Sequence, residues 1–181
     1  GILTAICLTA AYAFIGACWL ILKTEGDLQL KSVRWARRML WSLAAGFLAI
    51  SVATPLASPR VFEKWFSFPE MVLLAPLPIV SLGLLIGITM TLRHLPTQDD
   101  RYAWVPLIGA ICLFVLAFCG LAYSFYPYVV PEQMTIYEAA SAPESLLIIL
   151  FGTLFVLPVI MGYSAFSYFV FRGKATELRY D

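Results

Sequence analysis

Two carboxylates stand where a long uncharged run ends, in the stretch "LKTEGDLQ" at residues 22–29. Glu25 and Asp27 lie on either side of Gly26, and a carboxylate in such a place can take up a proton or pair with a base. Basic residues lie close in sequence: Lys23, Lys31 and Arg34. Because the dipole at a helix C-terminus disfavours unpaired acids, we expect partnered anchors that fix where the first helix leaves the membrane. Proton uptake from a water-filled mouth is the second hypothesis.

The only histidine in the chain is His94, and imidazole is a common ligand of haem iron and of metal ions. A methionine such as Met90 or Met39 would then have to bind the iron from the opposite face. A single histidine is weak evidence for a ligand set, and His94 comes just after an apolar run. An interfacial polar role is therefore the favoured interpretation.

A second acidic group lies between the last two apolar runs: Glu132, Glu138 and Glu144. These carboxylates could line an acidic mouth on one face of the membrane. Acidic residues are also common in solvated loops and near helix starts, where the helix dipole stabilises them. We favour this second, structural interpretation.

Other signals of catalysis are missing from the sequence. It contains no Gly-rich phosphate loop, no Gly-x-Ser-x-Gly turn and no Cys-x-x-Cys pair. The cysteines all lie in apolar runs, at Cys7, Cys18, Cys112 and Cys119. Neither a disulfide framework nor a zinc site is expected from them. We assign this chain no catalytic, cofactor-binding or metal-ligating residue, and expect any redox or transport chemistry to be completed by groups outside it.

The elements that carry these residues are indicated by five stretches without Asp, Glu, Lys or Arg: 1–22, 39–59, 71–92, 102–131 and 145–171. Each reaches the roughly 20 residues that an α-helix needs to cross a bilayer. The chain is also 61% hydrophobic and only 13% charged, unlike a soluble domain. We therefore predict an all-α integral membrane protein with five spans, at about 1–23, 39–57, 71–92, 102–123 and 145–171.

Details within these spans suggest how the helices behave. The first helix is expected to continue past Lys23, tilted out of the membrane, through the basic segment 28–38. In the third span, Pro76 and Pro78 predict a kink or a late helix start. The pair Gly83-x-x-x-Gly87 in that span could allow another helix to approach closely.

The placement of charge predicts the orientation of the chain. Three connecting or terminal segments, 23–38, 93–101 and 172–179, hold ten of the twelve Lys and Arg residues. With five alternating spans these segments share one side of the membrane. The excess of basic residues marks that side as cytoplasmic, so we predict the N-terminus outside and the C-terminus inside.

The N-terminus begins without Met, inside an apolar helix, and carries no basic segment of a signal peptide. We infer from this that the sequence is the latter part of a longer polypeptide with earlier spans.

Two stretches together carry a resemblance to a known family: "YAFIGACWLILKTEGDLQ" at 12–29 and "YPYVVPEQMTIYEAASAPESLLIILFGTLFVLPVIMGYSAFSYFVFRGK" at 126–174. The "LKTEG" turn, the "YP" followed by "TIYEAAS", and the closing "FRGK" occur in the order found in subunit II of the cytochrome bd quinol oxidases, which include the cyanide-insensitive oxidases. The whole of residues 1–181 resembles the C-terminal transmembrane half of that subunit.

The resemblance implies a four-helix bundle plus a peripheral helix, in the bacterial cytoplasmic (inner) membrane. It implies a partner, subunit I, that carries haems b and d, and a complex that oxidises quinol and reduces O2 to water in the respiratory chain. This chain would stabilise subunit I and shape proton or substrate access. The family's acidic proton-path residues lie outside this half, so none is carried over. Membrane lipid, quinol or quinone, and a small accessory subunit are further partners compatible with the resemblance; no nucleic-acid partner is expected.

Two other functions remain as alternatives. Half of a secondary transporter is suggested by the proline-interrupted third and fifth spans. That function would be favoured by polar residues clustered at mid-membrane, which the sequence does not show. An assembly or scaffold protein without a catalytic complex is the third hypothesis.

Overall fold

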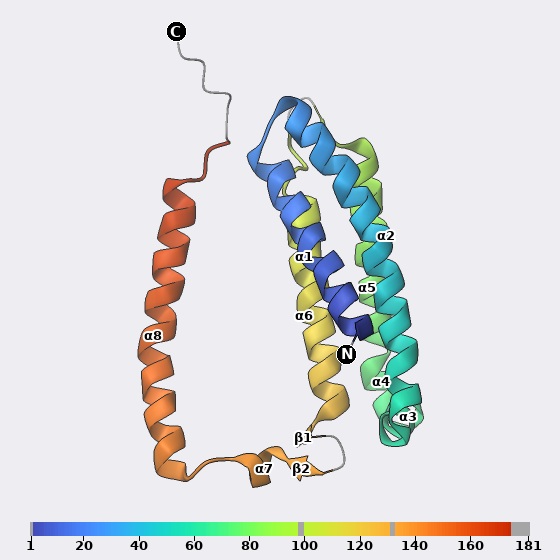
Figure 1. The fold of residues 1–181 in the computed structure, drawn as a ribbon, viewed down its shortest axis with the longest axis vertical. Coiled ribbons are helices and arrows are strands. Elements are labelled where there is room, and N and C mark those ends of the chain that lie inside the picture. Colours follow the sequence, from blue (N-terminus) through green and yellow to red (C-terminus); the bar gives the residue numbers. More distant parts are fainter. Residues whose placement is uncertain (1, 98–99, 131–132, 175–181) are drawn as a thin grey trace. The chain divides into compact units, whose positions relative to one another are not determined.

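The computed structural model describes residues 2–97, 100–130 and 133–174. Its elements, in chain order, are α1 (Ile2–Lys23), α2 (Gly26–Ala57), α3 (Pro59–Phe66), α4 (Glu70–Leu74), α5 (Pro76–His94), α6 (Val105–Phe125), β1 (Tyr128–Val130), β2 (Met134–Thr135), α7 (Ile136–Ala139) and α8 (Pro143–Val170) (Figure 1). Among these described residues, five helical segments are long and apolar enough to cross a membrane: α1, α2, α4 with α5, α6, and α8. The predicted all-α, five-span membrane fold is confirmed.

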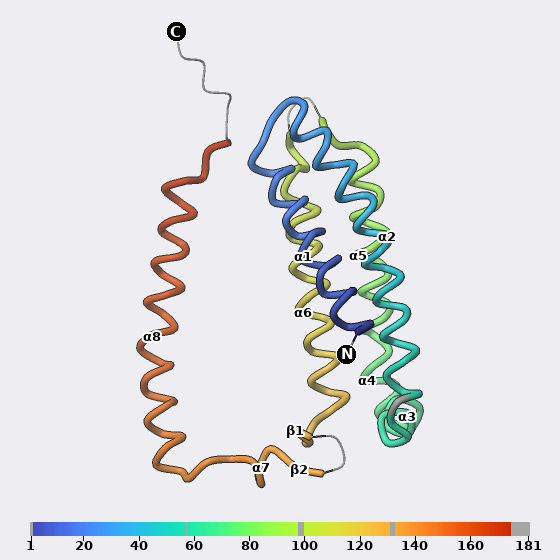
Figure 2. The backbone as a smooth tube through the Cα atoms, in the orientation of Figure 1, coloured from blue at the N-terminus to red at the C-terminus, as the bar shows by residue number. Residues whose placement is uncertain are grey.

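The second span begins much earlier than predicted. The expectation that the first helix continues through 28–38 is wrong, because α1 ends at Lys23 and the chain reverses direction before α2 (Figure 2). Gly26 has a φ of 63°, in the left-handed region that glycine enters at little cost. The basic segment is therefore the first part of α2, and its apolar residues Val33 and Ala36 are buried on the inner face of that helix.

The third span contains the irregularity predicted from its prolines. A short helix, α4, ends at Leu74, and α5 starts at Pro76, the first-turn position where a missing amide costs no hydrogen bond. The two helices together form one candidate span from Glu70 to His94. The late helix start at Pro76 is confirmed.

The described residues divide into two compact units. The first contains α1 to α6 up to Ser124, together with Lys174, and the second runs from Phe125 to Gly173. In the second unit β1 and β2 form a small antiparallel hairpin with Tyr128 opposite Thr135, followed by α7 and α8. None of the residues of α8 is buried, so its apolar surface is available to lipid or to other protein.

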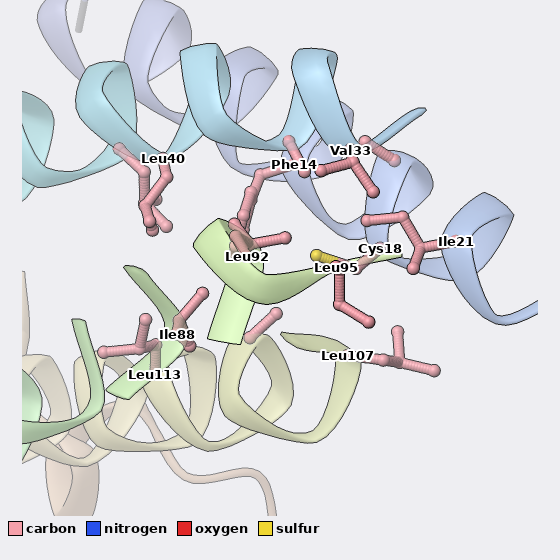
Figure 3. Packing of buried hydrophobic residues seen from close by; sticks show 14 of the residues in the cluster. Phe14, Cys18, Ile21, Val33, Leu40, Ile88, Leu92, Leu95, Leu107 and Leu113 are labelled. Carbon is pink, nitrogen blue, oxygen red and sulfur yellow. The ribbon is translucent and has the colours of Figure 1, made fainter. Parts of the chain in front are cut away.

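In the first unit, α1, α2, α5 and α6 pack around a shared apolar core (Figures 1 and 3). The largest fully buried side chains include Phe14 and Ile21 of α1, Ile88 and Leu92 of α5, and Leu113 of α6. These residues lie toward the end of the unit formed by the α1–α2 turn and the α5–α6 connection. We call this the basic end, because residues 23–38, 93–97 and 100–101 lie there. Several of the largest buried side chains of the four helices thus lie toward the basic end.

The close helix approaches occur at glycines other than the predicted pair. A Cβ atom added at Gly83 or Gly87 would meet nothing within 4 Å, so within this structure neither glycine allows a close approach. A Cβ at Gly46 would lie 2.7 Å from Cys7 Sγ, and one at Gly109 would lie 2.7 Å from Ile88 Cγ1. Gly46 brings α2 against α1, and Gly109 brings α6 against α5.

Candidate functional site

The α1–α2 turn holds Glu25 at the basic end. The backbone amide and Oγ1 of Thr24 both donate to the Leu20 carbonyl, at 2.9 and 2.7 Å, which closes the last turn of α1. Glu25 then has extended backbone as the residue before α2, and Gly26 turns the chain. The Glu25 side chain makes no capping hydrogen bond and is 56% exposed. It is therefore available for an ion pair.

Gln29 ties the end of α1 to the α5–α6 connection. This buried side chain donates from Nε2 to the Ile21 carbonyl at 3.1 Å and to Asp100 Oδ1 at 2.9 Å. The carbonyls in the last turn of a helix have no partner within the helix, so the amide of Gln29 satisfies one of them. The same amide holds one oxygen of Asp100 in place.

Lys174 completes this cluster from the far end of the sequence. Its ammonium contacts Asp100 Oδ2 and lies 3.7 Å from Glu25 Oε1. The Lys174 and Asp100 side chains are 25% and 23% exposed, so this pair is better shielded from water than the pair with Glu25. Asp100 adopts a φ of 48°, a left-handed conformation that Asp tolerates better than most residues. We call the cluster of Glu25, Gln29, Asp100 and Lys174 the lysine clamp.

The partner of Glu25 differs from the residues expected from sequence. Lys23, Lys31 and Arg34 were the nearby bases, whereas the ion pair in the structure is with Lys174. Asp100, Gln29 and Lys174 were missed as members of the site, because they are remote from Glu25 or uncharged. One signal could have found two of them: the charge pattern already placed the connections containing Asp100 and Lys174 on the same side as Glu25.

Asp27 occupies a different environment from Glu25. It is exposed in the first turn of α2, and among the residues the structure describes it has no ion-pair partner. We expected both carboxylates to lie at the C-terminus of the first helix, where the helix dipole disfavours them. That expectation is wrong, because α2 begins at Gly26. The N-terminal dipole of α2 stabilises Asp27 without a basic partner.

Arginine and lysine side chains also cap helix ends elsewhere in the first unit. At the basic end, Arg37 Nε donates to the Leu92 carbonyl of α5 at 3.0 Å, and Nη2 donates to the same oxygen. At the opposite end, Lys64 of α3 donates to the Tyr123 carbonyl of α6 at 2.7 Å and lies over the Tyr123 ring. Cations at these positions complement the negative end of the helix dipole.

Lys64 is accompanied by a second link between α3 and α6. Trp65 Nε1 donates to Ser124 Oγ at 2.9 Å, and that hydroxyl donates to the Gly120 carbonyl. Partial burial, followed by the charge of Arg60, lowers the pKa of Lys64, while Glu70 acts in the opposite direction. The short helix α3 is thus fastened across the end of α6 by side-chain contacts.

His94 and the methionines do not form a pair of axial haem ligands. His94 Nδ1 is 2.8 Å from the Met90 carbonyl oxygen, one turn earlier on α5. Met90 and His94 therefore lie on the same side of one helix and cannot bind one iron from opposite faces. Met39 of α2 packs against the apolar core. This arrangement agrees with the interfacial role expected for His94.

The second acidic group, between α6 and the last span, has a structural explanation for the two glutamates that the structure describes. Glu138 Oε2 accepts from the Thr135 amide at 2.8 Å, and Thr135 Oγ1 accepts from the Glu138 amide at 3.3 Å, which makes a capping box for α7. These hydrogen bonds, the backbone one first, lower the pKa of Glu138. Glu144 lies in the first turn of α8, and Glu132 lies outside the described residues.

The polar side chains of the described residues serve mainly to hold helices together. Within residues 2–97, 100–130 and 133–174, no buried side-chain nitrogen or oxygen lacks a hydrogen-bond partner. The same residues contain no group of three or more His, Cys, Asp or Glu side chains placed to bind a metal ion. The four cysteines are free thiols. The lysine clamp brings two carboxylates and an ammonium together at the basic end.

Comparison with known proteins supplies the context for this arrangement. A family model described as cytochrome bd terminal oxidase subunit II matches residues 1–171. That range includes all five candidate spans and the Glu25 turn, and it ends before Lys174. The search of curated proteins gives no match.

Proposed function

The chain belongs to the cytochrome bd terminal oxidase subunit II family, and on that premise we propose that it is a structural subunit that stabilises the haem-bearing subunit I. Membership makes it a component of a bd-type respiratory oxidase, and hence of an oxidoreductase complex. The transporter and scaffold alternatives have no comparable support. The complex would oxidise quinol and reduce O2 to water, with haems b and d held by subunit I.

One observation carries the structural role. Three polar side chains of the first unit link one helix to the end of another: Gln29, Arg37 and Lys64 each donate to a carbonyl in the last turn of a different helix. Such contacts fix the relative positions of helices. Among the described residues, every buried side-chain nitrogen or oxygen already has a hydrogen-bond partner. A rigid apolar bundle of this kind suits a subunit that presents a defined surface to a partner.

Glu25 is proposed as an anchor within the lysine clamp, and Asp27 as a stabiliser of the start of α2. The ion pair of Glu25 with Lys174 supports the first role, and the helix dipole supports the second. A second function, proton uptake, is favoured by one observation: more than half of the Glu25 side chain is exposed, close to the less exposed Asp100. Proton access would then begin at the basic end.

The location of the complex in the cell is proposed from the same family membership. We propose that the protein resides in the bacterial cytoplasmic membrane, with the basic end facing the cytoplasm. Residues 1–181 would be the C-terminal half of subunit II, and a small accessory subunit would be a further partner. The five apolar helices support the multi-pass membrane location.

Purification of the complex tests the proposal directly. The full subunit would be affinity-tagged, extracted in mild detergent and examined by absorption spectroscopy, with every co-purifying chain identified by mass spectrometry. We expect a haem-bearing partner in equal amount and loss of its haem bands from membranes that lack this subunit. Recovery of the tagged protein alone, together with full quinol oxidase activity in membranes without it, would contradict the proposal.

A further inference from the structure

A small pocket between α2 and α5 lies at the basic end, separate from the lysine clamp. Its volume is about 80 Å³, and six residues line it: Arg37, Leu40, Trp41, Thr89, Leu92 and Arg93. Arg37 and Trp41 are four residues apart on α2, and Thr89 and Arg93 are four residues apart on α5. Each pair therefore occupies one face of its helix, and the two faces border the same pocket.

The two arginines give this pocket a strong positive charge. Both side chains belong to exposed residues, and among the described residues no carboxylate lies within 4.0 Å of either guanidinium. Arg37 is held in place through its two contacts with the Leu92 carbonyl. A guanidinium has five N–H donors, so Arg37 keeps donors for a further acceptor. Positively charged, planar donors of this kind match the oxygens of a phosphate.

The other residues that line the pocket are of the types found where a helix passes from the hydrocarbon core into the headgroup region. Leu40 and Leu92 are buried and form an apolar wall, whereas Trp41 is 73% exposed. Trp41 lies in the middle of α2, but it borders the pocket with Leu92 and Arg93 in the last turn of α5. An exposed tryptophan at the level where a neighbouring span ends suits the interface between headgroups and acyl chains. Thr89 donates its hydroxyl proton to the Leu85 carbonyl at 2.7 Å, and its oxygen can still accept a hydrogen bond.

We propose that this pocket binds the phosphate of an anionic glycerophospholipid, with the lipid's first acyl carbons against Leu40 and Trp41. Two guanidiniums favour an anion over a neutral quinone ring. The apolar wall favours a phosphate that carries acyl chains over a free phosphate ion. Basic pockets between membrane helices are a known setting for anionic headgroups. Anionic lipid at this position would join α2 to α5 at the basic end.

Native mass spectrometry of the intact oxidase complex tests the proposal, with phosphatidylglycerol as the probe and phosphatidylcholine as the uncharged-headgroup comparison. The variant Arg93→Gln removes one guanidinium and leaves the Arg37–Leu92 contact in place. Arg38→Gln is its matched control, because it removes an equal charge from an exposed residue that does not line the pocket. An unchanged haem spectrum shows that each variant complex is assembled, and Arg93→Lys keeps the charge if Arg93→Gln fails to assemble.

We expect the complex to retain phosphatidylglycerol in preference to phosphatidylcholine. Arg93→Gln should weaken that retention by about tenfold, as expected for one lost charge-assisted contact, and Arg38→Gln should change it by less than about twofold. Arg93→Lys should give an intermediate value. Equal losses in the Gln variants would show diffuse surface charge and overturn the proposal. Equal retention of the two lipids, or displacement by millimolar inorganic phosphate, would overturn it as well.

Discussion

The Asp100 carboxylate relies on the Lys174 ammonium for its stabilisation more than the Glu25 carboxylate does. The Asp100 carboxylate is mostly shielded from water and is held by Gln29 on one oxygen and by Lys174 on the other. Glu25 is 56% exposed, so water can replace its basic partner. Removing the ammonium therefore leaves one poorly solvated carboxylate at the basic end.

Replacing Lys174 with Met should destabilise the complex by about 1–3 kcal/mol, because Asp100 would lose its charged partner. Lys174→Arg should lose much less, since it retains the charge. Adding Asp100→Asn to Lys174→Met removes the unpaired carboxylate, and Asn also tolerates the left-handed backbone at this position. Thermal unfolding of the purified complex would measure these three variants and the single variant Asp100→Asn. A double variant as unstable as the sum of the two single variants would show that the pair is not coupled.

Charge-neutral replacement of Glu25 and Asp27 separates anchoring from proton uptake. Glu25→Gln and Asp27→Asn keep the side-chain shapes and remove the charges that pair with Lys174 and the α2 dipole. We expect a fall of about 0.5–1 kcal/mol in stability for each variant, with quinol oxidase turnover unchanged within about twofold. Unchanged stability combined with a turnover loss of about tenfold would instead support proton uptake at Glu25.

At the scale of elements, close approach between helices is decided by tertiary packing and cannot be seen in a short motif. The Gly83-x-x-x-Gly87 pair has the spacing of a helix contact, yet both residues are exposed without neighbours at the Cβ position. Gly109 stands in no such motif but lies against Ile88, which is 2% exposed. The start of α2 was also missed, because a sequence does not reveal that Gly26 takes a positive φ.

The variant Gly109→Ala should destabilise the bundle by about 1–3 kcal/mol, because the new methyl group overlaps the buried Ile88 side chain. Gly83→Ala and Gly87→Ala are matched controls in neighbouring helix α5. There the methyl group meets nothing, and the better helix propensity of Ala should stabilise by up to about 1 kcal/mol. Thermal unfolding in detergent measures both effects. If Ile88→Ala, which removes the overlapping atoms, does not reduce the cost of Gly109→Ala, the proposed contact is wrong.

At the scale of the whole molecule, the five spans were predictable because burial in lipid requires long charge-free helices, and the runs at 71–92 and 145–171 match observed helices closely. The lysine clamp was only half predictable. Glu25 was visible as a carboxylate at the end of an uncharged run, but Lys174 lies 74 positions after Asp100 and no local spacing connects them. Only the shared side of the membrane linked these segments, and that depends on the predicted orientation.

The orientation itself is the remaining whole-molecule prediction. With the basic end in the cytoplasm, a fluorescent protein that folds only in the cytoplasm should fluoresce when fused after Asp181. The same reporter inserted at Ser67, in the connection between α3 and α4 at the opposite end, should stay dark. A periplasm-active phosphatase at the two positions should give the reverse pattern.

The charge difference between the two ends predicts this result, since ten basic residues lie on one side and only Arg60 and Lys64 on the other. Fluorescence at Ser67 and none after Asp181 would invert the topology. It would also place Glu25 and the lysine clamp outside the cell, where they could not take up cytoplasmic protons.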